Sequence, residues 1–221
     1  MSYSEARQPG HSLLSGPAIV GYLAGTKFLL HLLTAANYGL FTDELYFLAC
    51  GEHLAWGYVD MPPLTAAQAW LVRHLLGDSP YAIRLLPALA GAALVVMAGA
   101  MVRQMGGDRY AQALVALAVL VAPGWLAIDA YLSMNSIELL LVAAFAMIVI
   151  QIIKSGSTQL WVAFGAVAGI GLLNKHTVIL FGFALIFAVI VTPGRRIKFN
   201  RWFLAGGALA LVIFLPNLVW M

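Results

Sequence analysis

The chain has 221 residues, of which 62% are apolar and only 10% are Asp, Glu, Lys or Arg, and its mean hydropathy is +0.92. Because soluble domains carry about 25% charged residues, this composition excludes an ordinary soluble protein and indicates a membrane protein. The net charge is +3, but the sequence contains no polar domain that could present this charge as a basic patch. We therefore do not expect nucleic acid as a partner.

Seven apolar runs approach the length of about 20 residues that a helix needs to cross a bilayer. The expected spans are residues 17–36, 81–102, 110–128, 137–153, 160–173, 177–192 and 202–221. The first sixteen residues are polar and the first run is long, which predicts a retained anchor rather than a cleaved signal peptide. We therefore expect one all-α membrane domain, a bundle of about seven helices.

The basic residues predict the orientation of this bundle. Eight of the twelve fall on one side: Arg7, Arg103, Arg109, Lys154, Arg195, Arg196, Lys198 and Arg201. The positive-inside rule makes that side, with the N-terminus, cytoplasmic. Seven of the nine acids then lie on the outer side: Asp43, Glu44, Glu52, Asp60, Asp78, Asp129 and Glu138. Acidic residues contribute little to insertion, so this outward bias points to function.

Four of these acids lie in one stretch of the first outer loop (residues 37–80), YGLFTDELYFLACGEHLAWGYVDMPPL. Thr42 is typical of an N-cap, and Asp43 and Glu44 would follow in the first helical turn, where the helix dipole favours negative charge. Asp60 resembles a second helix start, with two prolines just inside it. The loop therefore predicts two short helices on the outer membrane surface.

Polar residues at the outer ends of the predicted spans border the same space as this loop. They are Arg84, Asp129, Asn135, Glu138, Lys175 and His176. We expect them to form a pocket at the boundary between water and lipid.

Five segments carry a resemblance to a known family. They are the loop stretch quoted above, SPYAIRLLPALAG, YLSMNSIELL, GIGLLNKHTVIL and FLPNLVW. Together they resemble the membrane glycosyltransferases of the protein mannosyltransferase and aminoarabinose transferase superfamily, in particular the bacterial dolichyl-phosphate-mannose mannosyltransferase-like group. The resemblance implies a GT-C fold, a polyprenyl-phosphate-linked sugar donor and a multi-pass protein of the bacterial inner membrane. Family members are commonly longer, so we expect this chain to be an N-terminal part.

The resemblance also implies residue roles. Asp43, the first acid of the family's DE pair, would be the base that takes the proton of the acceptor hydroxyl, and Glu44 would orient a partner or the acceptor. Arg84 and Lys175 would hold the departing phosphate, with Asp60 orienting them. Each residue also has an ordinary interpretation: Asp43 as a helix-start acid, and the two cations as side chains that reach lipid headgroups.

Asn135 stands where many relatives carry Asp, and an amide cannot act as a base. Glu138 or Asp129 could supply a second acid or a metal ligand, which leaves a divalent metal ion open as a cofactor. His176, at a helix end, is typical of an interfacial or packed side chain.

Lys27 is the only cation within the first predicted span, and a lysine at membrane depth is functional by default. It could instead pair with an acid such as Glu138 to join two spans, and we expect that structural role. A membrane transporter or lipid-binding subunit, with Lys27 and the outer acids on a path, is the alternative function. Gly165, Gly169 and Gly171 predict close helix packing. The sequence identifies neither sugar nor acceptor.

Overall fold

The computed structural model describes residues 13–192 and 200–221, and all regular structure in these residues is helical. The helices are α1 (Gly16–Thr34), α2 (Thr42–Glu52), α3 (Leu64–Leu76), α4 (Pro80–Ile83), α5 (Leu85–Gln104), α6 (Arg109–Val121), α7 (Pro123–Ile128), α8 (Met134–Ser155), α9 (Leu160–Asn174), α10 (Val178–Val191) and α11 (Arg201–Trp220). Four of the basic residues that we expect on the cytoplasmic side lie outside the described residues: Arg7, Arg195, Arg196 and Lys198.

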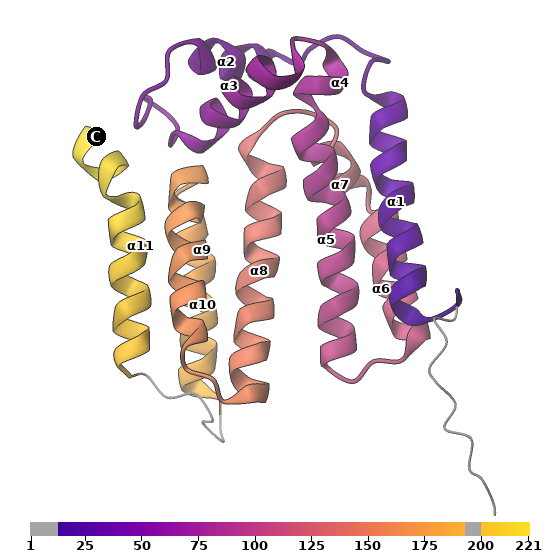
Figure 1. The fold of residues 1–221 in the computed structure, drawn as a ribbon, viewed down its shortest axis with the longest axis vertical. Helices are drawn as coiled ribbons and strands as arrows, with labels where there is room; N and C mark the ends of the chain where they lie inside the picture. The colour runs from indigo at the N-terminus through magenta and orange to yellow at the C-terminus, as the bar shows by residue number, and fades with distance from the viewer. Residues whose placement is uncertain (1–12, 193–199) are drawn as a thin grey trace, which may run out of the picture.

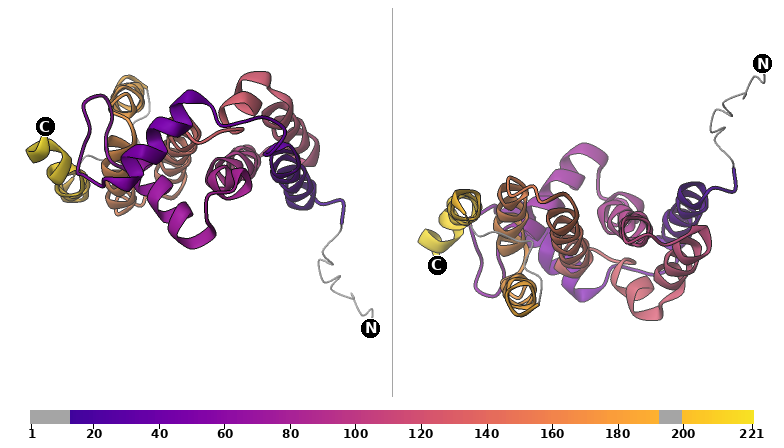
Figure 2. Two further views of the ribbon diagram at one scale, coloured as in Figure 1. Left: turned by 90° about the horizontal axis from the view of Figure 1, so that it is seen from above. Right: turned by 90° about the horizontal axis from the view of Figure 1, so that it is seen from below.

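The long helices stand side by side, and α2 and α3 lie across one end of them (Figure 1). The view from above shows α2 and α3 crossing the helix ends (Figure 2). We call this the loop end of the bundle. Apolar side chains of α2 and α3, including Phe47, Ala66 and Ala69, pack with Ile83 and Leu132 into a core beneath these two helices. The loop is therefore a packed layer over the bundle.

In the described part of the chain, four helical segments are long and apolar enough to cross a membrane: Gly16–Thr34, Pro80–Gln104, Met134–Ser155 and Arg201–Trp220. The apolar helices Arg109–Val121, Leu160–Asn174 and Val178–Ala188 are shorter. These findings confirm an all-α membrane protein.

Three local predictions were wrong. The expected span 110–128 is two helices, because Ala122 adopts the extended backbone favoured before a proline and Pro123 starts α7. The N-cap of α2 is Phe41 rather than Thr42, with the Glu44 carboxylate accepting the Phe41 N–H. Helix α3 begins at Leu64, after the prolines, rather than at Asp60.

Lys27 is fully buried and pairs with Asp129, not with Glu138 as predicted; its Nζ lies 2.7 Å from Asp129 Oδ2. The break between α6 and α7 places Asp129 beside α1 and α5. Gly91 of α5 makes room for the pair, since a Cβ there would lie 2.5 Å from Asp129 Oδ2. The pair joins α1 to the residue that follows α7, and Lys27 Nζ also donates to the Val119 carbonyl oxygen of α6 at 3.4 Å. This is the structural role that we expected for Lys27.

Helices α9 and α11 cross at glycines. A Cβ on Gly165 would overlap the Gly206 carbonyl oxygen, and one on Gly169 would lie 2.7 Å from Ile213 Cβ. A Cβ on Gly171 would lie 2.6 Å from Val178 Cγ1 at the start of α10. The predicted close packing at these glycines is confirmed.

Gly165→Ala is therefore expected to destabilise the protein by about 1–3 kcal/mol, the usual cost of overpacking, because α11 has to move away from α9. The measurement is the thermal unfolding midpoint in detergent. Gly182→Ala in α10 is the matched control, since its Cβ would meet nothing within 4 Å. Equal midpoints for the two variants would contradict this account of the crossing.

Candidate active site

Glu44 and Arg84 form a buried ion pair at the loop end. Arg84 Nε donates to Glu44 Oε1 at 3.0 Å and Nη2 donates to Oε2 at 2.7 Å, with exposed fractions of 4% for Arg84 and 0% for Glu44. The remaining guanidinium N–H groups donate to the carbonyl oxygens of Ala35, Tyr38 and Gly39. The bidentate bond fixes the first turn of α2 against the start of α5, and the bonds to the carbonyl oxygens hold the segment between α1 and α2. All the donors of Arg84 thus face acceptors within the protein.

The Glu44 carboxylate has two further partners. It accepts the Phe41 N–H at 2.8 Å and the Leu132 N–H at 3.0 Å. Burial alone would raise the pKa of Glu44, but the hydrogen bonds from Arg84, Phe41 and Leu132 together hold this pKa below its usual value of 4.5. Glu44 is therefore a charged group that ties α2 to the connector between α7 and α8.

Asp43, one residue before Glu44, is exposed in the first turn of α2. Within residues 13–192 and 200–221 no hydrogen bond or ion pair engages its carboxylate. The DE pair thus divides into a buried acid that holds the structure and an exposed acid without a bonded partner in the described residues.

Lys175 lies between α9 and α10, with its side chain 32% exposed. Its Nζ donates to Asn135 Oδ1 at 2.9 Å and to Glu138 Oε2 at 3.1 Å, both on the first turns of α8. Thr177 Oγ1 donates to the other oxygen of Glu138. This arrangement presents a partly exposed cation at the loop end, and we call these four residues the lysine cluster.

The connector between α7 and α8 joins the lysine cluster to the Glu44–Arg84 pair. Leu132 N–H donates to Glu44, and the Met134 carbonyl oxygen accepts from Asn174 Nδ2 at 2.8 Å. The backbone of this connector therefore links two hydrogen-bonded groups, Glu44 with Arg84 and Lys175 with Asn135 and Glu138.

Asp60 and His176 have other partners. Tyr46 Oη donates to Asp60 Oδ1 at 2.5 Å, and this bond raises the pKa of Tyr46. Asp60 therefore lies against α2 rather than against either of the cations that it was expected to orient. His176 packs its ring on Phe214 and hydrogen-bonds to Asn217 of α11.

Tyr46, Thr177 and Asn217 are site residues that sequence reasoning missed. Asn217 carried a usable signal, because an amide within an apolar span is costly unless it is bonded. Tyr46 and Thr177 carried none, since a hydroxyl next to a helix start is common.

For the metal, the described part of the chain contains no group of three or more His, Cys, Asp or Glu side chains that could hold an ion. The described residues therefore include no candidate ligand set for the divalent ion that the sequence analysis considered.

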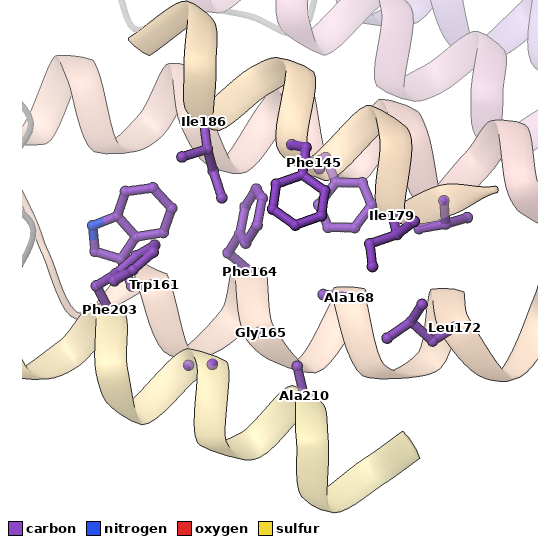
Figure 3. A pocket seen from close by; sticks show the side chains of 15 residues that line it. Phe145, Trp161, Phe164, Gly165, Ala168, Leu172, Ile179, Ile186, Phe203 and Ala210 are labelled. Carbon is purple, nitrogen blue, oxygen red and sulfur yellow. The ribbon is translucent and has the colours of Figure 1, made fainter. Parts of the chain in front are cut away.

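An apolar cavity of about 170 Å³ lies between α8, α9, α10 and α11 (Figure 3). Aromatic rings of Phe145, Trp161, Phe164 and Phe203 line one part of it, and Leu172 and Ile179 line the other (Figure 3). Leu172 and Ile179 lie three residues before and four residues after Lys175 in the chain. The lining is apolar and includes Val178, the residue that follows Thr177 of the lysine cluster.

One family model matches residues 60–220, and its description is dolichyl-phosphate-mannose-protein mannosyltransferase. The match covers Asp60, Arg84 and the lysine cluster, whereas Asp43 and Glu44 lie just before it. No curated protein and no solved structure matches the chain. Because the matched residues make up well over half of the 221, the chain belongs to the dolichyl-phosphate-mannose-protein mannosyltransferase family.

Proposed function

We propose that this chain is a membrane glycosyltransferase that moves a sugar from a polyprenyl-phosphate-linked donor to an acceptor hydroxyl, with inversion at the sugar carbon. The observation that carries the proposal is the pairing of chemistries at the loop end: the free carboxylate of Asp43 and the partly exposed cation of Lys175. These are the base and the phosphate ligand that such a transfer needs.

The proposed step is a single displacement. The acceptor oxygen forms a bond to the anomeric carbon while the bond from that carbon to the phosphate oxygen breaks. The hydroxyl proton passes to the Asp43 carboxylate, and polyprenyl phosphate leaves with the bonding electron pair as an anion. Lys175 stabilises the charge that develops on this leaving group.

Arg84 receives a positioning role in this proposal. Its N–H groups are used by Glu44 and three backbone carbonyls, so a phosphate would have to displace one of these partners. Arg84 instead holds Glu44, and Glu44 fixes the first turn of α2 from which Asp43 projects. Lys175, whose bonds to Asn135 and Glu138 are partly exposed, is the cation that a phosphate can reach.

The apolar cavity supports a lipid-linked donor, because it begins within about one helical turn of Lys175 along the chain. The charge bias of the sequence supports a cytoplasmic N-terminus and an outer active site in a bacterial inner membrane. The acceptor is a hydroxyl compound of unassigned class. No observation favours the transporter alternative, because Lys27, its decisive charge, is locked in a buried pair with Asp129.

The first test measures polyprenyl phosphate and its glycosylated form by native mass spectrometry of the protein extracted from bacterial membrane. Lys175→Gln is expected to retain these lipids about 10–100-fold more weakly than wild type, because it loses a charge-assisted hydrogen bond of about 1.5–3 kcal/mol. The attached mass on the wild type would identify the sugar class.

Lys154→Gln is the matched control, an exposed lysine at the opposite end of α8. It is expected to bind lipid as the wild type does. Equal retention by the Lys175→Gln variant would remove Lys175 from the donor site. Absence of polyprenyl lipid from the wild type would contradict the proposed donor.

A further inference from the structure

Asn217 is a buried amide in an apolar helix. Its exposed fraction is 1%, and it follows Pro216 near the end of α11. Such a group costs free energy in a membrane protein unless its hydrogen bonds are satisfied, and it therefore marks a specific interaction.

Both ends of the Asn217 amide are bonded to other segments. Nδ2 donates to the Trp56 carbonyl oxygen at 2.7 Å, 161 residues earlier in the chain. Because this bond fixes the amide orientation, Oδ1 faces His176 and accepts from its Nε2 at 3.3 Å. We call this arrangement of Trp56, Asn217 and His176 the latch.

Gly57 is built for the same contact. A Cβ at this position would lie 2.7 Å from Asn217 Nδ2 and 2.7 Å from Trp220 Cε3. Only a residue without a side chain lets the end of α11 approach the loop backbone this closely. The close approach and the two hydrogen bonds are independent observations of one contact.

The latch joins two parts of the proposed active site. On one side, the turn around Trp56 is tied to α2, because Tyr58 Oη bonds to the Cys50 carbonyl oxygen at 2.9 Å and Tyr46 holds Asp60. On the other side, His176 lies between Lys175 and Thr177, the two residues that bind Glu138. Asn217 is thus the link from the layer that carries Asp43 to the turn that carries the cation.

We propose that Asn217 is a positioning residue, which sets the loop layer of Asp43 in register with Lys175 through Trp56 and His176. This inference rests on the proposed glycosyl transfer. A misplacement of about 1 Å between base and leaving group can lower a rate about 100-fold, so a link of this kind controls turnover rather than donor binding.

The test combines two variants that open the latch from opposite sides, Asn217→Ala and Gly57→Ala. Each is expected to lower kcat for release of polyprenyl phosphate from polyprenyl-phosphate mannose about 10–100-fold, with the KM for this donor within about threefold of wild type. The double variant is expected to lose no more than the worse single variant, because both remove one link.

A second readout does not depend on catalysis. Cys50 is the only cysteine in the chain; it is partly buried, and its carbonyl oxygen accepts the hydrogen bond from Tyr58 that ties the latched turn to α2. Both variants are expected to raise the rate of maleimide labelling of Cys50 several-fold under native conditions. Leu218→Ala, which shortens an exposed side chain next to Asn217, is the control and is expected to change neither readout.

Wild-type kcat and wild-type labelling in the Asn217→Ala variant would overturn the latch. If the two losses in kcat multiply in the double variant, Asn217 and Gly57 do not act through one link. If activity falls only in proportion to the folded fraction, Asn217 has no positioning role. Wild-type protein that transfers no sugar would instead refute the proposed function, while the labelling rates would still decide whether the latch holds the loop.

Discussion

Replacing Asp43 by asparagine is expected to lower kcat for sugar transfer by about 10²–10⁴-fold, the usual contribution of a general base. The amide has nearly the same shape but cannot accept a proton from the acceptor hydroxyl. Asp43 is exposed and bonds to no residue in the described part of the chain, so the substitution leaves the fold and the Glu44–Arg84 pair intact. The measurement is release of polyprenyl phosphate from polyprenyl-phosphate mannose in membranes that contain the native acceptors.

Glu52→Gln is the matched control for this experiment. Glu52 ends the same helix and is exposed, and within the described residues it pairs only with the partly exposed Arg73, at 2.8 Å. Its replacement is expected to leave kcat unchanged, because exposed ion pairs contribute little. If the Asp43→Asn variant transfers sugar at the wild-type rate, Asp43 is not the base, and Glu138 becomes the candidate to test.

The sequence predicted most of the polar residues at the loop end, with Asp129 as the exception, but it did not predict which side chains pair. Hydrophobic run lengths and the placement of basic residues set the ends of the helices, and these ends determine that Arg84, Asn135 and Lys175 share one level. Pairing depends on helix rotation and on connector geometry, which run lengths do not carry. For this reason the sequence did not predict that Glu44 pairs with Arg84, or that Asp129 rather than Glu138 pairs with Lys27.

The break at Pro123 illustrates the same limit. The mostly apolar run from residue 110 to residue 128 predicts one helix, and a proline inside a membrane helix does not by itself decide whether the helix bends or ends. Here it ends, and the short α7 turns Asp129 back toward α1. The sequence did not predict the buried ion pair between Lys27 and Asp129. This pair stabilises the helix break, because the break brings the two side chains together.

Replacing Arg84 by methionine is expected to destabilise the protein by about 3–5 kcal/mol, because it leaves Glu44 charged, buried and without its main partner. Thermal unfolding in detergent, followed by tryptophan fluorescence, measures the effect. Arg73→Met is the control, a partly exposed arginine paired with the exposed Glu52 and Asp78, for which the expected loss is below about 1 kcal/mol. Equal midpoints for the two variants would contradict the buried pair.

Adding Glu44→Gln to the Arg84→Met variant is expected to restore part of the lost stability. The glutamine carries no charge, and its side-chain oxygen still accepts the Leu132 N–H. The double variant then separates the two roles of Arg84. If Arg84 only positions α2, the folded double variant retains polyprenyl phosphate as the wild type does. If a folded double variant loses the lipid although Lys175 is unchanged, Arg84 itself binds the donor phosphate.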